Sequence, residues 1–218
     1  MTKRALKFGK YSTASDGWTL SALSLTYPER RACNVELPYA DGSIDLLESV
    51  SDEPRYSTRE LTATLELSSG TRAERTAKIN TLANAYHGRT VPITLPDDPD
   101  HWLSGRVHIS VQCNDRAHAI VDITATCQPW RTAWQSRTVE ADLASVSSIL
   151  LPNGGGKRLV PSIEVVGTED VTITLENDSW TLSPGTSVLP EIQIPPGGIT
   201  YGLSGSGIVR FHYVEALL

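Results

Sequence analysis

Two alternating runs on either side of a short turn constrain the fold of this chain more than any other feature. The runs are "GRVHISVQC" (residues 105–113) and "AHAIVDITATC" (residues 117–127), with "NDR" between them. Apolar residues occupy every second position of each run, which predicts two half-buried strands joined as a long antiparallel hairpin. On this pattern, one face of the first strand holds Val107, Ile109, Val111 and Cys113.

The segment before the hairpin changes its hydrophobic period. "RELTATLEL" (residues 59–67) alternates with a period of two, so it predicts another half-buried strand, whose outward face includes Arg59. The apolar residues that follow recur at the spacing of one helix face: Ile79, Leu82, Ala83 and Tyr86.

Local signals mark both ends of that helix. Thr71 and Glu74 have the spacing of a capping box, and Gly88 supplies the left-handed residue that commonly ends a helix. His87 is interpreted as a side chain that satisfies the last helix carbonyls. We prefer this to a catalytic base because no nucleophile motif accompanies it. We expect one helix over residues 72–87.

The C-terminal part predicts a second domain. Residues 131–160 are mostly polar and include three consecutive glycines in "LPNGGGKR", which is typical of a joint. Short strands separated by regular turn signals follow, as in a β-sandwich: "SIEVV", "VTITL", "SWTL", "EIQI", "ITYGL" and "IVRFHYV". We therefore expect a mainly β chain with an N-terminal domain over residues 1–135 and a C-terminal β-sandwich over residues 136–218.

Charge and composition exclude several classes of protein. The net charge of -6 divides into -2 over residues 1–149 (16 basic, 18 acidic) and -4 over residues 150–218 (3 basic, 7 acidic), so neither part offers a cationic surface for nucleic acid. No apolar run approaches the roughly 18 residues of a membrane span, and no secretory signal is recognisable. We expect a soluble protein made in a cytoplasm. The three cysteines, at positions 33, 113 and 127, are interpreted as reduced and buried.

The acidic cluster "DDPDH" (residues 97–101) has two interpretations. Asp, His and Glu side chains are common metal ligands, but these residues are consecutive and lack the glycine and distal glutamate of a calcium loop. We interpret Asp97, Asp98 and Pro99 as a hairpin turn in which aspartates cap backbone amides, and we expect no metal, cofactor or catalytic residue.

The glycine-rich and tryptophan patterns also allow more than one interpretation. "NGGGKR" lacks the first glycine and the final Ser or Thr of a phosphate loop, and "GLSGSG" matches no dinucleotide or nucleophile motif. The five tryptophans, at positions 18, 102, 130, 134 and 180, could form a sugar-stacking platform, but burial is the commoner role. Trp130 and Trp134 flank the expected joint and are candidates for a domain or subunit interface.

In order along the chain, these features resemble the distal tail proteins of long-tailed siphophages. The N-terminal motifs are "ELPYADGSIDL", with its "YADG" turn, and then "PRYSTRELTATLEL", His87-Gly88-Arg89, Asp97-Asp98-Pro99, Gly105-Arg106 and Cys127-Gln128-Pro129-Trp130. The stretch from "NGGGKRLVPSIEVVG" to "GSGIVRFHYVEALL" is similar to the galectin-like or carbohydrate-module-like sandwich of that family.

The resemblance implies a non-enzymatic hub at the phage tail tip. It implies a homo-hexameric ring between the tail tube protein and the tail-tip hub proteins, with a channel through which DNA passes. A neutral or acidic channel wall would let DNA slide, since few phosphates would be neutralised. The alternative is a lectin-like host-recognition module. A hydrolase is a third class, for which the sequence assembles no nucleophile, base and orienting residue.

Overall fold

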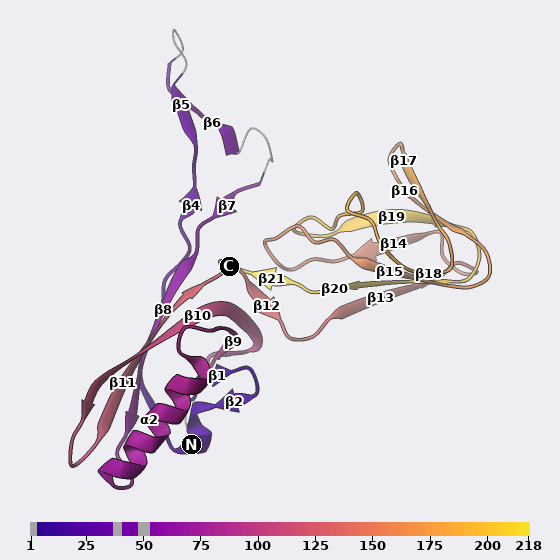
Figure 1. Ribbon diagram of the computed structural model, residues 1–218. Helices are drawn as coiled ribbons and strands as arrows, with labels where there is room; N and C mark the ends of the chain where they lie inside the picture. The colour runs from indigo at the N-terminus through magenta and orange to yellow at the C-terminus, as the bar shows by residue number, and fades with distance from the viewer. Residues whose placement is uncertain (1–3, 37–40, 48–52) are drawn as a thin grey trace. The chain divides into compact units, whose positions relative to one another are not determined.

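The computed structural model describes residues 4–36, 41–47 and 53–218 (Figure 1). It divides into two compact units, residues 1–131 and 132–218. Each unit has its own hydrophobic core. The domain boundaries expected from the sequence, 1–135 and 136–218, remain a prediction.

Unit 1 is built on one antiparallel sheet. Its strands lie in the order β2 (Tyr11–Ser12), β1 (Lys7–Phe8), β9 (Thr90–Leu95), β10 (Asp98–Asn114), β11 (Ala119–Cys127), β8 (Arg59–Leu67) and β3 (Thr19–Leu25). A 3-10 helix, η1 (Thr13–Asp16), follows β2, and the helix α2 (Arg72–Tyr86) connects β8 to β9. This mainly β architecture, with a helix and a long hairpin, confirms the expected fold class.

The predicted hairpin is β10 and β11, but its tip differs from the sequence pattern. The register runs from Gly105 opposite Cys127 to Asn114 opposite Ala119, with a β-bulge between Val111 and Cys113. The bulge adds one residue to β10, so every later side chain changes face. Cys113 pairs with Ile120, whereas Asn114 turns to the helix side and donates from Nδ2 to Thr76 Oγ1 at 2.8 Å. The prediction that Cys113 shares a face with Val107 was therefore wrong.

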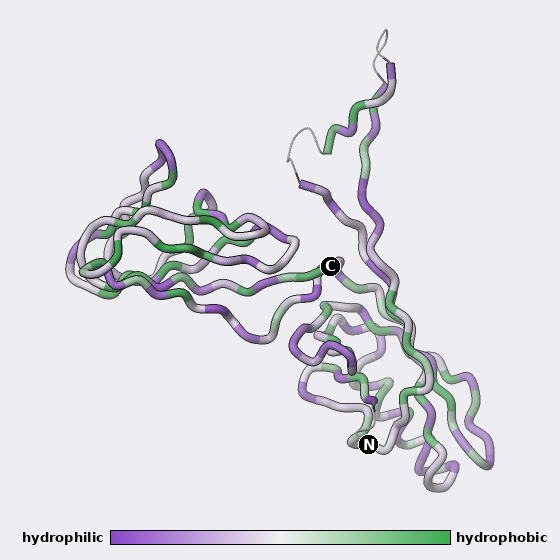
Figure 2. The backbone as a smooth tube through the Cα atoms, turned by 180° about the vertical axis from the view of Figure 1, so that it is seen from behind, coloured by the Kyte–Doolittle hydropathy of each residue, from purple (hydrophilic) through white to green (hydrophobic). Residues whose placement is uncertain are grey.

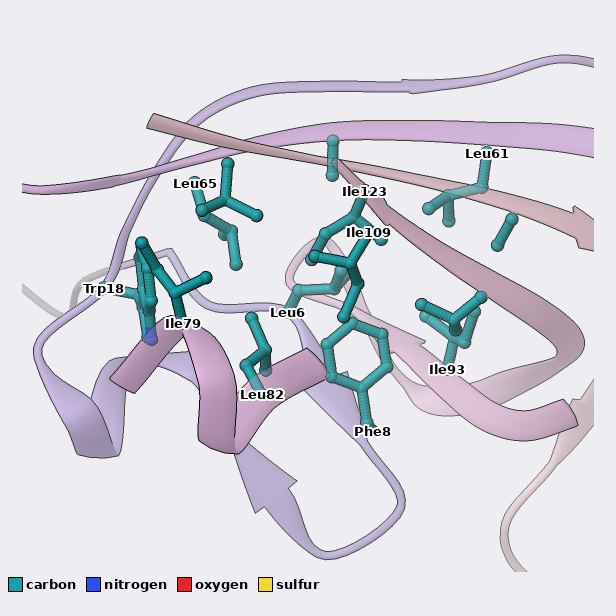
Figure 3. Packing of buried hydrophobic residues seen from close by; sticks show 14 of the residues in the cluster. Leu6, Phe8, Trp18, Leu61, Leu65, Ile79, Leu82, Ile93, Ile109 and Ile123 are labelled. Carbon is teal, nitrogen blue, oxygen red and sulfur yellow. The ribbon is translucent and has the colours of Figure 1, made fainter. Parts of the chain in front are cut away.

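The core of unit 1 lies between the sheet and α2 (Figure 3). Ile79 and Leu82 of α2 pack on it, and Trp18 is fully buried. Arg59 was expected to face outward and is instead 4% exposed, because its odd position in β8 places it on the same face as Leu61. Such a burial is tolerated where the guanidinium keeps hydrogen-bond partners.

We call residues 26–58, between β3 and β8, the arm; its described residues form short paired strands and contribute to neither hydrophobic core. It contains two short ladders: β4 (Arg30–Arg31) with β7 (Arg55–Tyr56), and β5 (Asn34–Glu36) with β6 (Ser43–Asp45). Figure 2 shows hydrophobic stretches along it. In the "YADG" turn, Tyr39 and Ala40 lie outside the described residues.

Unit 2 is a β-sandwich of two four-stranded sheets. One has the order β13 (Arg137–Asp142), β20 (Ile208–Tyr213), β15 (Ser162–Val166) and β18 (Gly185–Val188). The other has the order β14 (Ser148–Leu151), β19 (Ile199–Ser204), β16 (Val171–Leu175) and β17 (Asp178–Leu182). Two short strands, β12 (Arg131–Ala133) and β21 (Ala216–Leu217), pair with each other.

Three details of unit 2 correct the sequence interpretation. Residues 131–160 are not only a joint, since β13 and β14 lie within them. The "EIQI" segment forms only an isolated bridge between Leu159 and Ile194, while β18 occupies part of a predicted turn. Alternation does not reveal β13 and β18 because they bury few side chains, and β14, which buries Ile149 and Leu151, is only four residues long.

Two further expectations concern cysteines and membranes. Cys127 is buried as expected, but Cys113 is half-buried and Cys33 is exposed; all three are free thiols. Among the described residues, no helix has the length and apolar character needed to cross a membrane.

Close strand contact makes a specific prediction at Gly105. A β-carbon there would lie 2.6 Å from Cys127 Sγ and 2.9 Å from Ile93 Cδ1. We expect Gly105→Ala to destabilise unit 1 by about 1 to 3 kcal/mol through overpacking, measured by urea unfolding. Ser110→Ala, on the exposed face of the same strand, is the control and should change stability by less than about 0.5 kcal/mol. Equal stability of the two variants would contradict the packing described.

Candidate functional site

Hydrogen bonds at the start of α2 form a complete capping box. Thr71 Oγ1 accepts from the Glu74 amide at 3.3 Å, and a Glu74 carboxylate oxygen accepts from the Thr71 amide at 2.7 Å. The backbone bond from Thr71 lowers the pKa of Glu74 below its usual 4.5. Thr71 and Glu74 thus satisfy backbone amides at the start of α2.

The end of α2 is joined to the edge of β10. Gly88 has φ +76, and its amide donates to Val107 O at 2.7 Å. We expected His87 to satisfy the last helix carbonyls, but its Nδ1 instead accepts from the Ile109 amide at 3.1 Å. The pairing of β9 with β10 ends at Thr90 opposite Arg106, so beyond this point His87 supplies the acceptor that a strand would otherwise provide.

The acidic cluster lies at the turn between β9 and β10, but its side chains do not cap amides as expected. Leu95 pairs with Asp98 across this turn. Asp97 forms an ion pair with Arg4, and both side chains are about two-thirds exposed, at 65% and 64%. Asp98 is 20% exposed and contacts His101 Nδ1 at 2.7 Å and Arg131 at 2.8 Å. These carboxylates pair with arginines far away in the sequence, Arg4 for Asp97 and Arg131 for Asp98.

Pro99 and Asp100 are exposed at the start of β10. Since Asp97 and Asp98 bind different cations and Asp100 joins neither contact, the three aspartates do not converge on one point. Among the described residues, the groups of side chains placed to share a metal ion do not include them.

Arginines that the sequence analysis did not identify hold the end of unit 1. Arg59 donates to Pro129 O at 3.0 Å, and Arg131 reaches Asp98. Burial, together with the neighbouring Arg131, lowers the pKa of Arg59. Trp130 packs edge-on against Tyr56 with ring centroids 5.5 Å apart. The odd position of Arg59 in an alternating strand was the available signal.

The tryptophans do not assemble into a stacking platform. Trp18 is buried, Trp102 and Trp130 are half-buried, and Trp180 packs on the core of unit 2. Trp134 is 47% exposed. A sugar-binding face needs several exposed rings in one place, and the five positions do not provide it.

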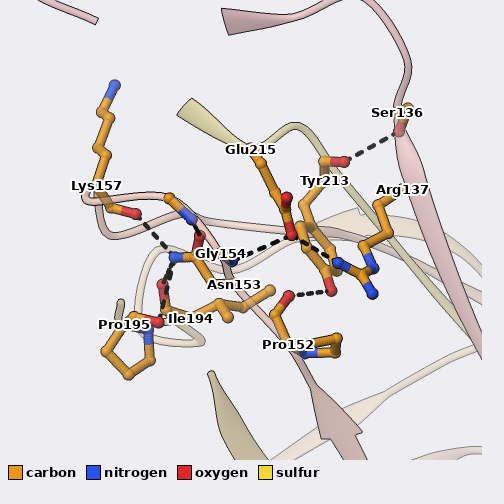
Figure 4. A network of polar contacts seen from close by, with 11 residues as sticks. Ser136, Arg137, Pro152, Asn153, Gly154, Lys157, Ile194, Pro195, Tyr213 and Glu215 are labelled. Atoms are coloured by element: carbon orange, nitrogen blue, oxygen red, sulfur yellow. Dashed lines mark hydrogen bonds and ion pairs between the residues drawn. The ribbon is translucent and has the colours of Figure 1, made fainter. Parts of the chain in front are cut away.

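The glycine-rich segment of unit 2 wraps around a buried asparagine (Figure 4). Asn153 is 2% exposed; its Nδ2 donates to the carbonyls of Lys157, Ile194 and Pro195, and its Oδ1 accepts from the Gly155 amide. Nearby, Tyr213 donates to Pro152 O at 2.6 Å. These bonds fix the loop against the C-terminal strands.

This loop has the wrong hydrogen bonds for binding an anion. The amides of Gly154, Gly155 and Gly156 donate to Glu215 Oε1, Asn153 Oδ1 and Ala216 O, at 3.4, 3.0 and 3.1 Å. A phosphate cradle presents free amides, and a carboxylate beside the loop repels phosphate. The glycines serve close packing instead.

Comparisons with known proteins place the fold. No protein-family model and no curated protein matches the sequence. Among solved structures, the chain is similar to the Dit protein (gp 19.1) of phage SPP1, described as a paradigm of the hub adsorption apparatus in phages that infect Gram-positive bacteria. The similarity has a TM-score of 0.72 and 16% sequence identity, and it covers 99% of each chain. The chain therefore has a Dit-like fold over its whole length, which confirms the resemblance at the level of structure.

The two neighbouring aspartates provide a matched test. Asp98→Asn removes a charge held by Arg131 in a half-buried setting, so we expect a loss of about 1.5 to 3 kcal/mol in the free energy of unfolding at neutral pH. Asp97→Asn affects an exposed ion pair and should cost less than about 1 kcal/mol. Urea titrations of both variants measure the difference, and equal losses would count against the anchoring role of Asp98.

Adjacent glycines test the packing of the unit 2 loop. A β-carbon at Gly155 would overlap the Ala216 carbonyl oxygen, whereas one at Gly154 meets only a Glu215 oxygen at 3.7 Å. We expect Gly155→Ala to destabilise unit 2 by about 1 to 3 kcal/mol, and Gly154→Ala to be neutral or slightly stabilising. Thermal unfolding of the two variants decides; similar midpoints would show that the loop is not packed as described.

Proposed function

We propose that this chain is a distal tail protein of a siphophage, a non-enzymatic hub of the tail tip. The observation that carries the proposal is the shared fold with SPP1 Dit over 99% of both chains, with neither a missing unit nor an extra one. In this proposal six copies form a ring that joins the tail tube protein to the tail-tip hub proteins, within the virion. DNA passes through the channel and is not bound.

The arm supports an assembly of several copies. Among the described residues of the arm, the large apolar ones that are exposed are Tyr27, Val35, Ile44, Leu46 and Leu47, each with between 36% and 81% of the residue's surface exposed. Val35 and Ile44 lie directly opposite each other in the β5–β6 ladder. A two-stranded ladder is only marginally stable in water and gains stability when another surface covers it. We infer that a neighbouring copy covers the arm.

Charge supports a channel that does not hold DNA. Residues 1–131 carry 15 basic and 16 acidic side chains, so the unit that would surround the channel is slightly acidic overall. The outward face of β8 and β11 presents small polar side chains, including Thr62, Thr64 and Thr124, together with Asp122. A surface of this kind releases few counterions from DNA. Trp130 and Trp134 remain candidates for a subunit interface.

The lectin-like alternative gains no support from unit 2. A sandwich fold by itself does not indicate a saccharide site, because function depends on the residues grafted on the fold. The scattered tryptophans supply no platform there. The hub is therefore the function that we put forward.

Light scattering of the purified full chain tests the proposal. We expect a mass several times 23.7 kDa at micromolar concentration. Ile44→Glu places a charge in the proposed contact and should shift the assembly to single chains, while leaving the circular dichroism spectrum unchanged. Val188→Glu, at a position 59% exposed in unit 2, is the control and should leave the mass unaltered.

Each outcome has a distinct meaning. A native chain that stays monomeric up to high concentration would contradict the ring, since association follows mass action. If the native chain forms a ring and Ile44→Glu leaves its mass unchanged, the result would contradict the proposed role of the arm but not the ring itself.

A further inference from the structure

The tip of the β10–β11 hairpin brings a thiol, a carboxylate and an imidazole together. One ligand atom each from Cys113, Asp115 and His118 lies within 4.8 Å of the other two. Cys113 and His118 are half-buried, and Asp115 is exposed. This cluster lies apart from the acidic turn at the other end of β10, and the proposed hub function does not use it.

The bulge in β10 creates this cluster. Because of the extra residue, Cys113 pairs with Ile120 and faces away from α2. The Asp115 amide donates to His118 O at 3.1 Å, so Asp115 and His118 continue the ladder beyond the last strand pair. Residues two apart in a strand share a face, and opposite residues share it too. Cys113, Asp115 and His118 therefore point to the same side.

The backbone under the cluster is fixed from the helix side. Arg75 is 1% exposed; its guanidinium donates to Gly70 O at 2.5 Å and to Asp115 O at 2.7 Å. Next to it, Asn114 bonds to Thr76. Since α2 holds the turn on one side, the three ligand side chains on the other side start from a defined position, which lowers the cost of ordering them around an ion.

Hydrogen bonds within the turn leave Asp115 able to bind a cation. Its Oδ1 accepts from the amides of Ala117 and His118 at 2.7 and 2.9 Å. These bonds engage one carboxylate oxygen and leave the second for another ligand.

We propose that Cys113, Asp115 and His118 bind Zn²⁺ at the hairpin tip. Sulfur, imidazole nitrogen and carboxylate oxygen are the donors that Zn²⁺ takes, at about 2.0 to 2.3 Å, while Ca²⁺ and Mg²⁺ take oxygen. A thiolate and a carboxylate also balance the charge of a divalent cation. Ligand atoms around a tetrahedral Zn²⁺ are roughly 3.5 Å apart. The ligand atoms of the three residues lie within 4.8 Å of one another, so small side-chain rotations bring them to this spacing. Water completes the fourth position, and the ion clips the two strands together.

Titration of the full-length reduced chain with Co²⁺ and then Zn²⁺ tests this site. We expect Co²⁺ to give a thiolate-to-metal charge-transfer band that one equivalent of Zn²⁺ abolishes, because both ions accept tetrahedral sulfur ligands. Cys113→Ser should remove the band. Cys33→Ser removes another accessible thiol outside the cluster and is the matched control; its band should match that of the native chain.

Two further variants test the other ligands without removing the thiol. Asp115→Asn retains an oxygen that can accept the turn hydrogen bonds, and His118→Gln retains a polar side chain. Each should weaken Zn²⁺ affinity at least about tenfold. A loss of about tenfold is already typical when a residue that only hydrogen-bonds to a metal ligand is replaced. Competition with a chromophoric chelator measures this affinity, and circular dichroism checks the fold.

Three results would overturn the proposal: a native chain without the Co²⁺ band, a band that persists in Cys113→Ser, or a band lost in Cys33→Ser. If Cys113→Ser fails to fold, the remaining pair decides. Unchanged affinity in both Asp115→Asn and His118→Gln would then reject the site. None of these results depends on whether the chain forms a ring.

Discussion

Backbone hydrogen bonding along β10 is the constraint on which unit 1 depends. This strand pairs with β9 on one edge and β11 on the other, and buried amides must find partners. Where β9 ends, Gly88 and His87 bond to β10 in its place. The start of α2 is tied to the same hairpin by Arg75. The position of the helix follows from these two attachments, and the core forms beneath it.

Side-chain period explains which elements could be predicted from the sequence. In β8, β10 and β11 one face is mostly buried and the other is half-buried or exposed, so alternation identifies the strands. The charge of Arg59 predicts an outward position, whereas its odd position in the alternating strand places it on the buried face. Cys113 was misplaced because a bulge changes the face of later residues without any change in composition. Strands such as β13, with a single buried residue, leave little pattern.

The same distinction applies to the candidate site. Thr71, Glu74 and Gly88 act through neighbours within a few residues, so local sequence carries the information. The partners of Asp97 and Asp98 include Arg4 and Arg131, which are separated from them by 93 and 33 positions. The Cys113 cluster depends on a bulge and a turn together. The spacing of residues in the sequence does not predict such long-range contacts, because they depend on the strand register.

In unit 1 Thr71 and His87 bond to backbone amides, and in unit 2 Asn153 and Tyr213 bond to backbone carbonyls. Such structural roles agree with the hub that we propose. Class averages of the negatively stained, purified chain test this account most directly. The account predicts closed rings with sixfold symmetry and an open centre. Particles the size of a single chain at every concentration would contradict it.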